Sequence, residues 1–302
     1  MNLKLLPFIF SLIVTLIVSC GNNSQPLSNL SAQINKQNPL RPECVVIVSI
    51  DGGKPASIQK AQMPVLSKVA SEGAFTWKAE TIFPSLTLPS HTSMITGVEP
   101  SVHRFLWNDW REEKGLITIP TIFTLAKNNG MKTALFATKQ KFKHFNTPNT
   151  LDKFTYFDRS AKQIASEVVL YFKAENPNLT FVHFQDADKA GHKFGWESSE
   201  QIQSLEEIDT ALGEIVSVIK ASKRACTLII TADHGGSAKG HGSNSPDDTN
   251  IPWIAWGYKI QKTELQSSIK TTDTAATTLY LLGVSHPSSW SGRLVKEALK
   301  ED

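Results

Sequence analysis

Acidic, imidazole and hydroxyl side chains gather in short motifs that follow strand-like segments. The stretch 231–242, TADHGGSAKGHG, places Asp233 and His234 in a glycine-rich turn, and His241 follows in the same loop. Asp and His supply oxygen and nitrogen ligands that Zn²⁺ accepts, and glycines let the backbone turn so that such ligands converge. The pattern favours a metal site, although an isolated Asp-His-Gly also occurs in ordinary surface loops.

Two further segments carry potential metal ligands. Asp51 directly follows the apolar run 44–50 and precedes paired glycines, which by itself is an ordinary Asp-Gly turn. Asp188 and His192 are four residues apart, a spacing that puts both on one face of a helical turn. Asp186 is a competing ligand, which we place second because it breaks the Asp-x-x-Gly-His spacing.

Thr87 is the candidate nucleophile. It lies in the segment FPSLTLPSHTSMITG, just before a short helical pattern that ends at Gly97. A hydroxyl at a helix N-terminus has free N–H groups and the positive end of the helix dipole beside it. This setting favours attack on an anionic group, and the alternative is that Thr87 only caps the helix.

These motifs need a scaffold that brings strand ends together. Continuous apolar segments, typical of strands buried on both faces, occur at 44–50, 133–137, 180–184, 227–231 and 251–256. Helical patterns lie around them at 63–71, 121–129, 160–174, 198–222 and 274–282. The alternation predicts an α/β fold with a mostly parallel central sheet and helices on both faces. Ligands gather beyond the carboxyl ends of strands in such sheets.

Residues 1–20 predict export. Lys4 precedes an apolar run, which is short for a membrane span, and the run ends in Ile-Val-Ser-Cys20. This is the layout of a signal peptide, and its end looks like a bacterial lipobox that would place a lipid on Cys20; an ordinary signal peptide is the alternative. Residues 21–41 are rich in Asn, Ser, Gln and Pro and predict a flexible tether. We expect a protein of the bacterial cell envelope, anchored to a membrane and facing the periplasm or the cell surface.

The net charge bears on nucleic-acid binding, and the cysteines bear on disulfide formation. The net charge of +3 and the lack of a Lys/Arg run give no electrostatic case for a nucleic-acid-binding surface. Cys44 and Cys226 each lie seven residues before a motif aspartate, Asp51 and Asp233. If those aspartates meet at one metal, the two sulfurs lie at similar depth, and we hypothesise that they oxidise in an exported protein. Two separate thiols are the alternative, because bridging neighbouring parallel strands strains disulfide geometry.

Taken in chain order, the motifs resemble the alkaline phosphatase superfamily, and most closely its type I phosphodiesterase/nucleotide pyrophosphatase branch. The resemblance runs from residue 44 to 295 and rests on Ser-Ile-Asp51-Gly, Phe-Pro-Ser-Leu-Thr87-Leu-Pro-Ser-His, Asp188-x-x-Gly-His192, Asp233-His234-Gly and His241-Gly. It implies that residues 42–302 form an alkaline phosphatase-like catalytic domain, without a sizeable cap domain because the chain is short. Asn108 falls where the family keeps an Asn that holds a phosphoryl oxygen.

The resemblance also implies a site with two Zn²⁺ ions, for which Mn²⁺ or Fe would be a poorer fit. The first ion would be held by Asp188, His192 and His241, and His286 is a rival for the last position. The second would be held by Asp51, Asp233, His234 and Thr87. Thr87 would form a covalent phospho-threonine, while Asn108 binds a non-bridging oxygen.

The sequence therefore predicts an exported, metal-dependent phosphodiesterase or nucleotide pyrophosphatase that acts on small phosphodiester or nucleotide substrates. One alternative is a phosphomonoesterase, in which Arg104 could hold the extra negative oxygen. Another is a non-catalytic, zinc-binding lipoprotein. A sulfatase is disfavoured because position 87 is neither Cys nor Ser. Trp196, close to His192, is our candidate for an apolar wall beside the leaving group.

Overall fold

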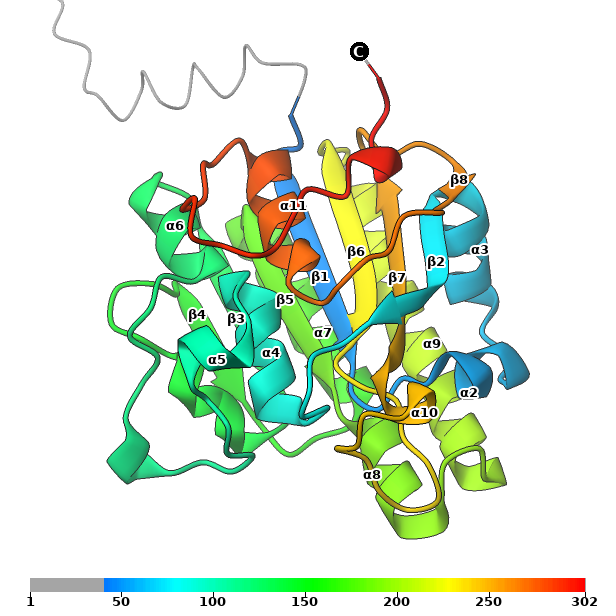
Figure 1. The fold of residues 1–302 in the computed structure, drawn as a ribbon. Helices are drawn as coiled ribbons and strands as arrows, with labels where there is room; N and C mark the ends of the chain where they lie inside the picture. The colour runs from blue at the N-terminus through cyan, green and yellow to red at the C-terminus, as the bar shows by residue number, and fades with distance from the viewer. Residues whose placement is uncertain (1–40, 302) are drawn as a thin grey trace, which may run out of the picture. The chain divides into compact units, whose positions relative to one another are not determined.

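The computed structural model describes residues 41–301, which all fall within one compact unit. The predicted signal peptide, the lipid on Cys20 and nearly all of the tether lie outside the described residues. Within the described range, none of the helices combines the length and the apolar character needed to cross a bilayer. The same range shows no cap domain beside the sheet (Figure 1).

The centre of the fold is an eight-stranded sheet of order β4-β3-β5-β1-β6-β7-β2-β8 (Figure 1). Five neighbouring strands are parallel, and they are β4 (Lys153–Tyr156), β3 (Thr133–Ala137), β5 (Leu179–Phe184), β1 (Cys44–Ile50) and β6 (Cys226–Ala232). The antiparallel strand β7 (Asn250–Gly257) separates them from the parallel pair β2 (Ala74–Glu80) and β8 (Thr263–Glu264). The prediction of a mostly parallel sheet is confirmed, whereas β2, β4 and β8 were not predicted.

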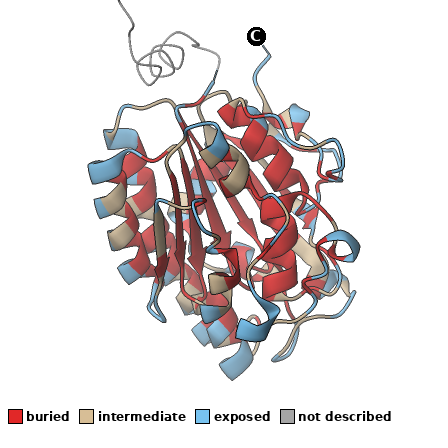
Figure 2. Ribbon diagram, turned by 90° about the vertical axis from the view of Figure 1, so that its left-hand side faces the viewer, coloured by how far each residue is buried: buried red, intermediate tan, exposed pale blue. Residues whose placement is uncertain are grey.

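Helices cover both faces of the sheet, as predicted. Successive β1 side chains enter two different apolar clusters, Val45 and Ile47 on one face and Val46 and Val48 on the other. The first cluster is completed by α4 (Thr87–Thr96), α6 (Ile122–Asn128) and α11 (Asp273–Leu282). The second is completed by α3 (Pro64–Glu72), α7 (Ala161–Glu175) and α9 (Ser199–Ala221). Figure 2 shows the buried strands lying between helices.

Shorter elements join these layers. They are α2 (Pro55–Lys60), α5 (Pro100–His103), α8 (Asp186–Phe194) and α10 (Pro246–Thr249), with the 3-10 segments η1 (Glu112–Lys114), η2 (Gln140–Phe145) and η3 (Lys296–Ala298). Both α4 and α11 end at glycines in the left-handed region, Gly97 with φ 64° and Gly283 with φ 73°. These are the positions at which the sequence predicted the two helices to stop, since glycine adopts this conformation without a Cβ clash.

The register of β1 against β6 aligns both the cysteines and the motif aspartates. Cys44 is paired with Cys226, their Cα atoms are 4.6 Å apart, and a disulfide joins them. The hypothesis of a bond between neighbouring strands is thereby confirmed. The same register pairs Ile50 with Ala232, so Asp51 and Asp233 leave the sheet side by side.

Candidate active site

Three aspartates meet at the carboxyl edge of the parallel strands. Asp51 follows β1, Asp233 follows β6, and Asp188 lies in the first turn of α8 after β5. Asp51 and Asp233 are fully buried, and Asp188 is 3% exposed. The topology alone explains this meeting, because β5, β1 and β6 are adjacent and parallel.

Each of these carboxylates has one oxygen held by the protein. Asp51 Oδ2 contacts His183 Nε2 at 2.8 Å and Lys139 Nζ at 2.6 Å, and Asp188 Oδ2 contacts the same Nζ at 2.6 Å. Asp233 Oδ1 accepts the backbone N–H groups of Gly52 and His234 at 3.1 and 3.0 Å. These contacts fix the carboxylate planes and leave the second oxygen of each for another partner.

That second oxygen is unpaired in all three residues. Among the described side chains, Asp51 Oδ1, Asp188 Oδ1 and Asp233 Oδ2 are buried oxygens without a hydrogen-bond donor. Burying an unpaired anionic oxygen is costly, and three in one place are more so. The donor set therefore fits a site for positive ions.

Three histidines face the unpaired oxygens. The Nδ1 atoms of His192, His234 and His241 lie 3.0, 2.8 and 2.8 Å from backbone carbonyl oxygens. An Nδ1–H that donates to a carbonyl leaves Nε2 with a free lone pair, which is the tautomer that binds metals. His234 Nε2 lies 3.4 Å from Asp51 Oδ1 and 3.3 Å from Asp233 Oδ2. His192 and His241 Nε2 lie 3.3 and 3.5 Å from Asp188 Oδ1.

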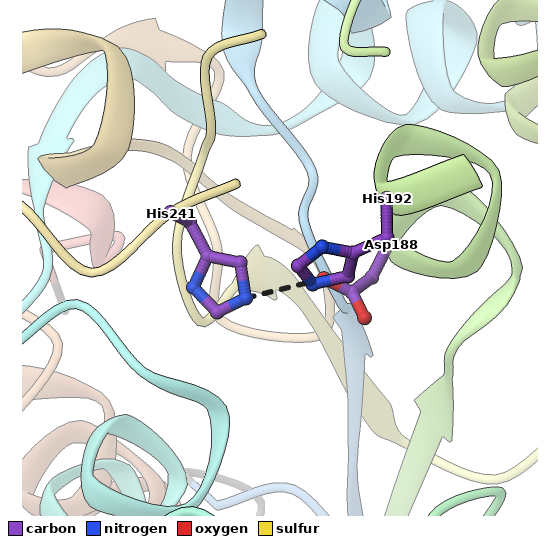
Figure 3. Close-up of side chains that lie close together, drawn as sticks. All are labelled: Asp188, His192 and His241. Carbon is purple, nitrogen blue, oxygen red and sulfur yellow. Dashed lines mark ion pairs between the residues drawn. The ribbon is translucent and has the colours of Figure 1, made fainter. Parts of the chain in front are cut away.

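The side chains form two overlapping groups that could hold metal. Asp188, His192 and His241 offer atoms within 4.8 Å of one another, and so do Asp51, Asp188 and His234. Figure 3 shows the first group, with Asp188 and His192 from α8 and His241 from the loop after β6. The first group is the predicted set, and the second contains Asp188 where the resemblance implied Asp233. The ligand roles stay predictions.

The rival ligands lie elsewhere. The Asp186 carboxylate accepts the Ala161 N–H at the start of α7, at 3.2 and 3.1 Å for its two oxygens. His286 is exposed and stacks on Trp290. Neither residue contributes to the two groups that could hold metal.

Thr87 is the first residue of α4 and is fully buried beside this cluster. Its Oγ1 lies 3.4 Å from His234 Nε2 and 3.4 Å from Lys139 Nζ. Asn108 lies next to it, because its Oδ1 accepts the Leu88 N–H at 2.9 Å. The structure thus brings both predicted catalytic residues to the N-terminus of one helix, where the first N–H groups lack intrahelical acceptors.

Sequence reasoning missed two lysines in this site. Lys139 lies two residues after β3 and Lys141 two residues further on, in η2. The negative charges of Asp51 and Asp188 raise the pKa of Lys139, against the lowering effect of burial, so its ammonium stays charged. Lys141 Nζ lies 2.9 Å from Asn108 Oδ1. The signal that could have found Lys139 is the strand-end rule that found Asp51.

His183 was also missed, since a histidine within a buried strand resembles an ordinary core residue. It contacts Asp51 Oδ2 through Nε2 and Thr138 Oγ1 through Nδ1, at 2.8 and 2.9 Å. His91, on α4, contacts the Thr87 carbonyl oxygen and Ser49 Oγ, both at 2.8 Å. Both histidines hold site residues in place.

Crowded charges perturb the ionisation of the cluster. Burial, together with the charge of Asp51, raises the pKa of Asp233 to about 7. Burial lowers the pKa of His234, but the charges of Asp233 and Asp51 outweigh it and raise that pKa to about 9. Both pKa values are raised, so a proton competes with a metal ion for these groups, and such perturbed pKa values are typical of functional sites.

Trp196 packs against the loops that carry predicted metal ligands. Its Nε1–H donates to the Gly52 carbonyl at 3.1 Å, and the residue is 8% exposed. An added Cβ on Gly52, Gly191 or Gly236 would press into or against the indole. Three segments that carry predicted ligands enclose this side chain, which argues against the expected apolar wall beside the leaving group. Arg104, the expected monoesterase residue, is exposed and makes no hydrogen bond or ion pair with the described site residues.

Residues 45–239 match the model of the family described as type I phosphodiesterase/nucleotide pyrophosphatase. The chain belongs to this family. Membership confirms the resemblance read from the motifs, and the matched range contains every predicted site residue except His241.

Curated relatives of this family member are distant. A bis(5'-adenosyl)-triphosphatase of Bos taurus is 26% identical over 219 residues, which are 64% of this chain and 48% of that protein. A GPI ethanolamine phosphate transferase 1 of Saccharomyces cerevisiae is 24% identical over 279 residues, 76% of this chain and 30% of that protein. The chain spans less than half the length of both.

Solved structures share the fold. A murine ectonucleotide pyrophosphatase/phosphodiesterase 5, solved as an inactive threonine-to-alanine variant with AMP, has a TM-score of 0.72 at 16% identity. The match covers 85% of this chain and 100% of that one. A 2-O GAG sulfatase has a TM-score of 0.70 at 14% identity, covering 84% of this chain and 73% of that one. At these identities the likeness establishes the fold alone.

Proposed function

We propose that this chain is an exported, metal-dependent hydrolase of phosphoric ester bonds. It would act as a phosphodiesterase or nucleotide pyrophosphatase through a covalent intermediate on Thr87. One observation carries the proposal: three unpaired carboxylate oxygens and three imidazole Nε2 atoms converge beside the Thr87 hydroxyl. Family membership and the bovine relative, which is named as a triphosphatase, support it.

The donor set of carboxylate oxygen and imidazole nitrogen suits zinc. Asp188, His192 and His241 would hold one ion, and Asp51, Asp233, His234 and Thr87 the other. When bound, two such ions supply positive charge that lowers the pKa of the hydroxyl and stabilises the entering and leaving oxygens of an in-line displacement. This division of ligands is proposed from the resemblance and from the contacts given above.

The chain's own groups perform the transfer in two steps. The Thr87 hydroxyl loses its proton to solvent, and its oxygen forms a bond to phosphorus while the bond from phosphorus to the leaving oxygen breaks, which gives a phospho-threonine. Water then bonds to phosphorus and loses its protons, the Thr87–phosphorus bond breaks, the Thr87 oxygen takes up a proton, and the product leaves. Asn108 accepts the Leu88 N–H with Oδ1, so its Nδ2 amide can donate to a non-bridging oxygen as charge develops there.

Small nucleotides are the proposed substrates. The AMP bound by the murine fold relative and the name of the bovine relative support a phosphoryl group attached to a nucleoside. The proposed base-binding element is Trp107, which is half-buried next to Asn108 and stacks on the buried Phe105 with ring centroids 4.5 Å apart.

Export and anchoring belong to the same proposal. The Cys44–Cys226 disulfide suits an oxidising compartment outside the cytoplasm, and a lipid on Cys20 would hold the domain to a membrane of the bacterial cell envelope. Fractionation of the full chain against Cys20→Ser tests this, since only the unchanged protein is expected in the membrane fraction. Equal membrane association of both would contradict the lipid anchor.

Hydrolysis of bis(4-nitrophenyl) phosphate by zinc-loaded protein tests the activity. A chelator should abolish turnover and added zinc should restore it. Thr87→Ala should reduce kcat by at least about 1000-fold, and acid-quenched wild type should carry a phosphoryl group on the peptide that contains Thr87. Thr92→Ala is the matched control, because this buried α4 hydroxyl bonds only the Leu88 carbonyl. Absence of turnover by the zinc-loaded wild type would favour the non-catalytic zinc protein instead.

A further inference from the structure

Lys141 is a charged group in the site that lacks a counter-ion. Its neighbour Lys139 contacts two carboxylates, those of Asp51 and Asp188. Lys141 is only partly exposed, forms no ion pair with any described carboxylate, and donates to the neutral Asn108 Oδ1 at 2.9 Å. Burial, together with the charge of Lys139, lowers the pKa of Lys141 to about 8. Holding an ammonium in this position is unfavourable unless an anion joins it.

The position of Lys141 points to which anion this is. Asn108 Oδ1 accepts from both Lys141 Nζ and the Leu88 N–H, and Leu88 directly follows Thr87. The lysine thus lies near the N-terminus of α4. The positive end of the helix dipole there favours an anion and disfavours the ammonium of Lys141 unless an anion lies between them. A phosphoryl group undergoing attack by Thr87 would be the anion shared by these groups.

The charge of the site indicates how negative that phosphoryl group can be. With the two divalent ions of the proposed function, the three aspartates and an ionised Thr87 are neutralised. Lys139 and Lys141 are additional, so they leave an excess of two positive charges. The phosphoryl group of a diester carries one negative charge, whereas that of a monoester carries two near neutral pH. The excess therefore matches a dianionic group better than a monoanionic one.

We propose that Lys141, supported by Lys139, binds a non-bridging oxygen of a dianionic phosphoryl group, so that phosphomonoesters belong to the substrate class of this site. The inference rests on the proposed transfer to Thr87. For a monoester, the ester bond to phosphorus breaks as the Thr87–phosphorus bond forms, and the leaving alkoxide takes a proton from water. Hydrolysis of the phospho-threonine then releases inorganic phosphate. A diester would instead release a monoester, which can re-enter the site.

The test compares 4-nitrophenyl phosphate with bis(4-nitrophenyl) phosphate in the zinc-loaded protein. Lys141→Met keeps most of the aliphatic stem and removes the charge, and should lower kcat/KM for the monoester by about 30-fold, the effect of one charge-assisted hydrogen bond. The diester should lose no more than about three-fold. Lys141→Arg should keep the wild-type ratio of the kcat/KM values for the monoester and the diester. Lys143→Met is the matched control in η2, because its ammonium lies over the Trp110 and Tyr156 rings, and it should leave both rates unchanged.

The inference would be overturned if Lys141→Met lowered kcat/KM by the same factor for both substrates, or changed neither value. Binding to the wild type gives a second measurement that no folding defect can obscure. Inorganic phosphate at pH 8 should bind at least about ten-fold more tightly than the monoanion dimethyl phosphate. Comparable affinities would refute the role of the lysines. Failure of the proposed function is distinct, because then the wild type would hydrolyse neither nitrophenyl compound.

Discussion

The two sides of Thr87 are constructed differently. On the metal-ligand side, every carboxylate and imidazole is fixed by a second contact, such as the backbone carbonyl bonded by each histidine Nδ1. On the lysine side, Asn108 Oδ1 accepts from the Leu88 N–H and from Lys141, and Lys141 belongs to a short 3-10 segment and bonds only this oxygen among the described groups. Metal ligands must be held in a fixed orientation. Residues on connecting segments vary more, and such segments often carry the groups that bind a substrate. Under the proposed function, the metal-ligand side would carry out the transfer and the lysine side would select which phosphoryl group is accepted.

The largest effect expected on metal binding distinguishes Asp188 from Asp186, two aspartates of α8. Asp188→Asn should reduce the bound zinc and lower diesterase activity by at least about 100-fold, because Asp188 contacts both histidines of its group. Asp186→Asn is the matched control, since that carboxylate bonds the α7 backbone and lies outside the site. Metal analysis of the dialysed proteins gives the ion content directly. Equal zinc loss in the two variants would mean that α8 folding, and not ligation, is being measured.

A second experiment tests whether stability and zinc binding depend on the packing of the loop after β6 against Trp196. Gly236→Ala would place a Cβ inside the Trp196 indole, so we expect a loss of about 2 kcal/mol in the free energy of unfolding and weaker zinc binding. Gly240→Ala, in the same loop, meets nothing within 4 Å and should leave stability nearly unchanged. Denaturant unfolding with and without zinc measures both. If the Gly236 variant were as stable and as zinc-replete as the control, Trp196 would have no supporting role.

The same contrast explains what could be predicted from the sequence. Asp51 and Asp233 could be placed because each ends a continuous apolar strand, and the register of β1 with β6 then aligns them. Such strands are buried on both faces and have an unmistakable composition. The metal-ligand side is therefore largely predictable from strand ends and motif spacing.

The lysine side could not be predicted in this way. In the segment 139–145, lysines alternate with other residues as on a solvated surface, and only the fold turns Lys139 and Lys141 toward Thr87. The strands β2 and β4 escaped prediction for a similar reason. Their residues alternate between buried and half-exposed positions or occupy a short stretch near the sheet edge, so they lack a continuous apolar run.

The smallest expected effect concerns how the Asn108 segment is attached to α4. His103 accepts the Phe105 N–H with Nδ1 and contacts Ser93 Oγ of α4 with Nε2, both at 3.0 Å. Burial lowers the pKa of His103 to about 4 from 6.5. Between these two pH values the unfolded chain binds a proton that the folded one does not, so the folded state loses stability as the pH falls. The contribution is complete above pH 6.5 and ends near pH 4.

His103→Gln should remove about 1–2 kcal/mol of this pH dependence, because an amide can donate and accept but does not titrate. Urea unfolding at a series of pH values between 7 and 4 measures the slope. His286→Gln is the control, since that exposed ring bonds only its neighbour Pro287 and stacks on Trp290. Parallel curves for His103→Gln and wild type would show that the attachment of the Asn108 segment does not depend on a neutral His103. A flatter curve would tie the lysine side to α4 through this one ring.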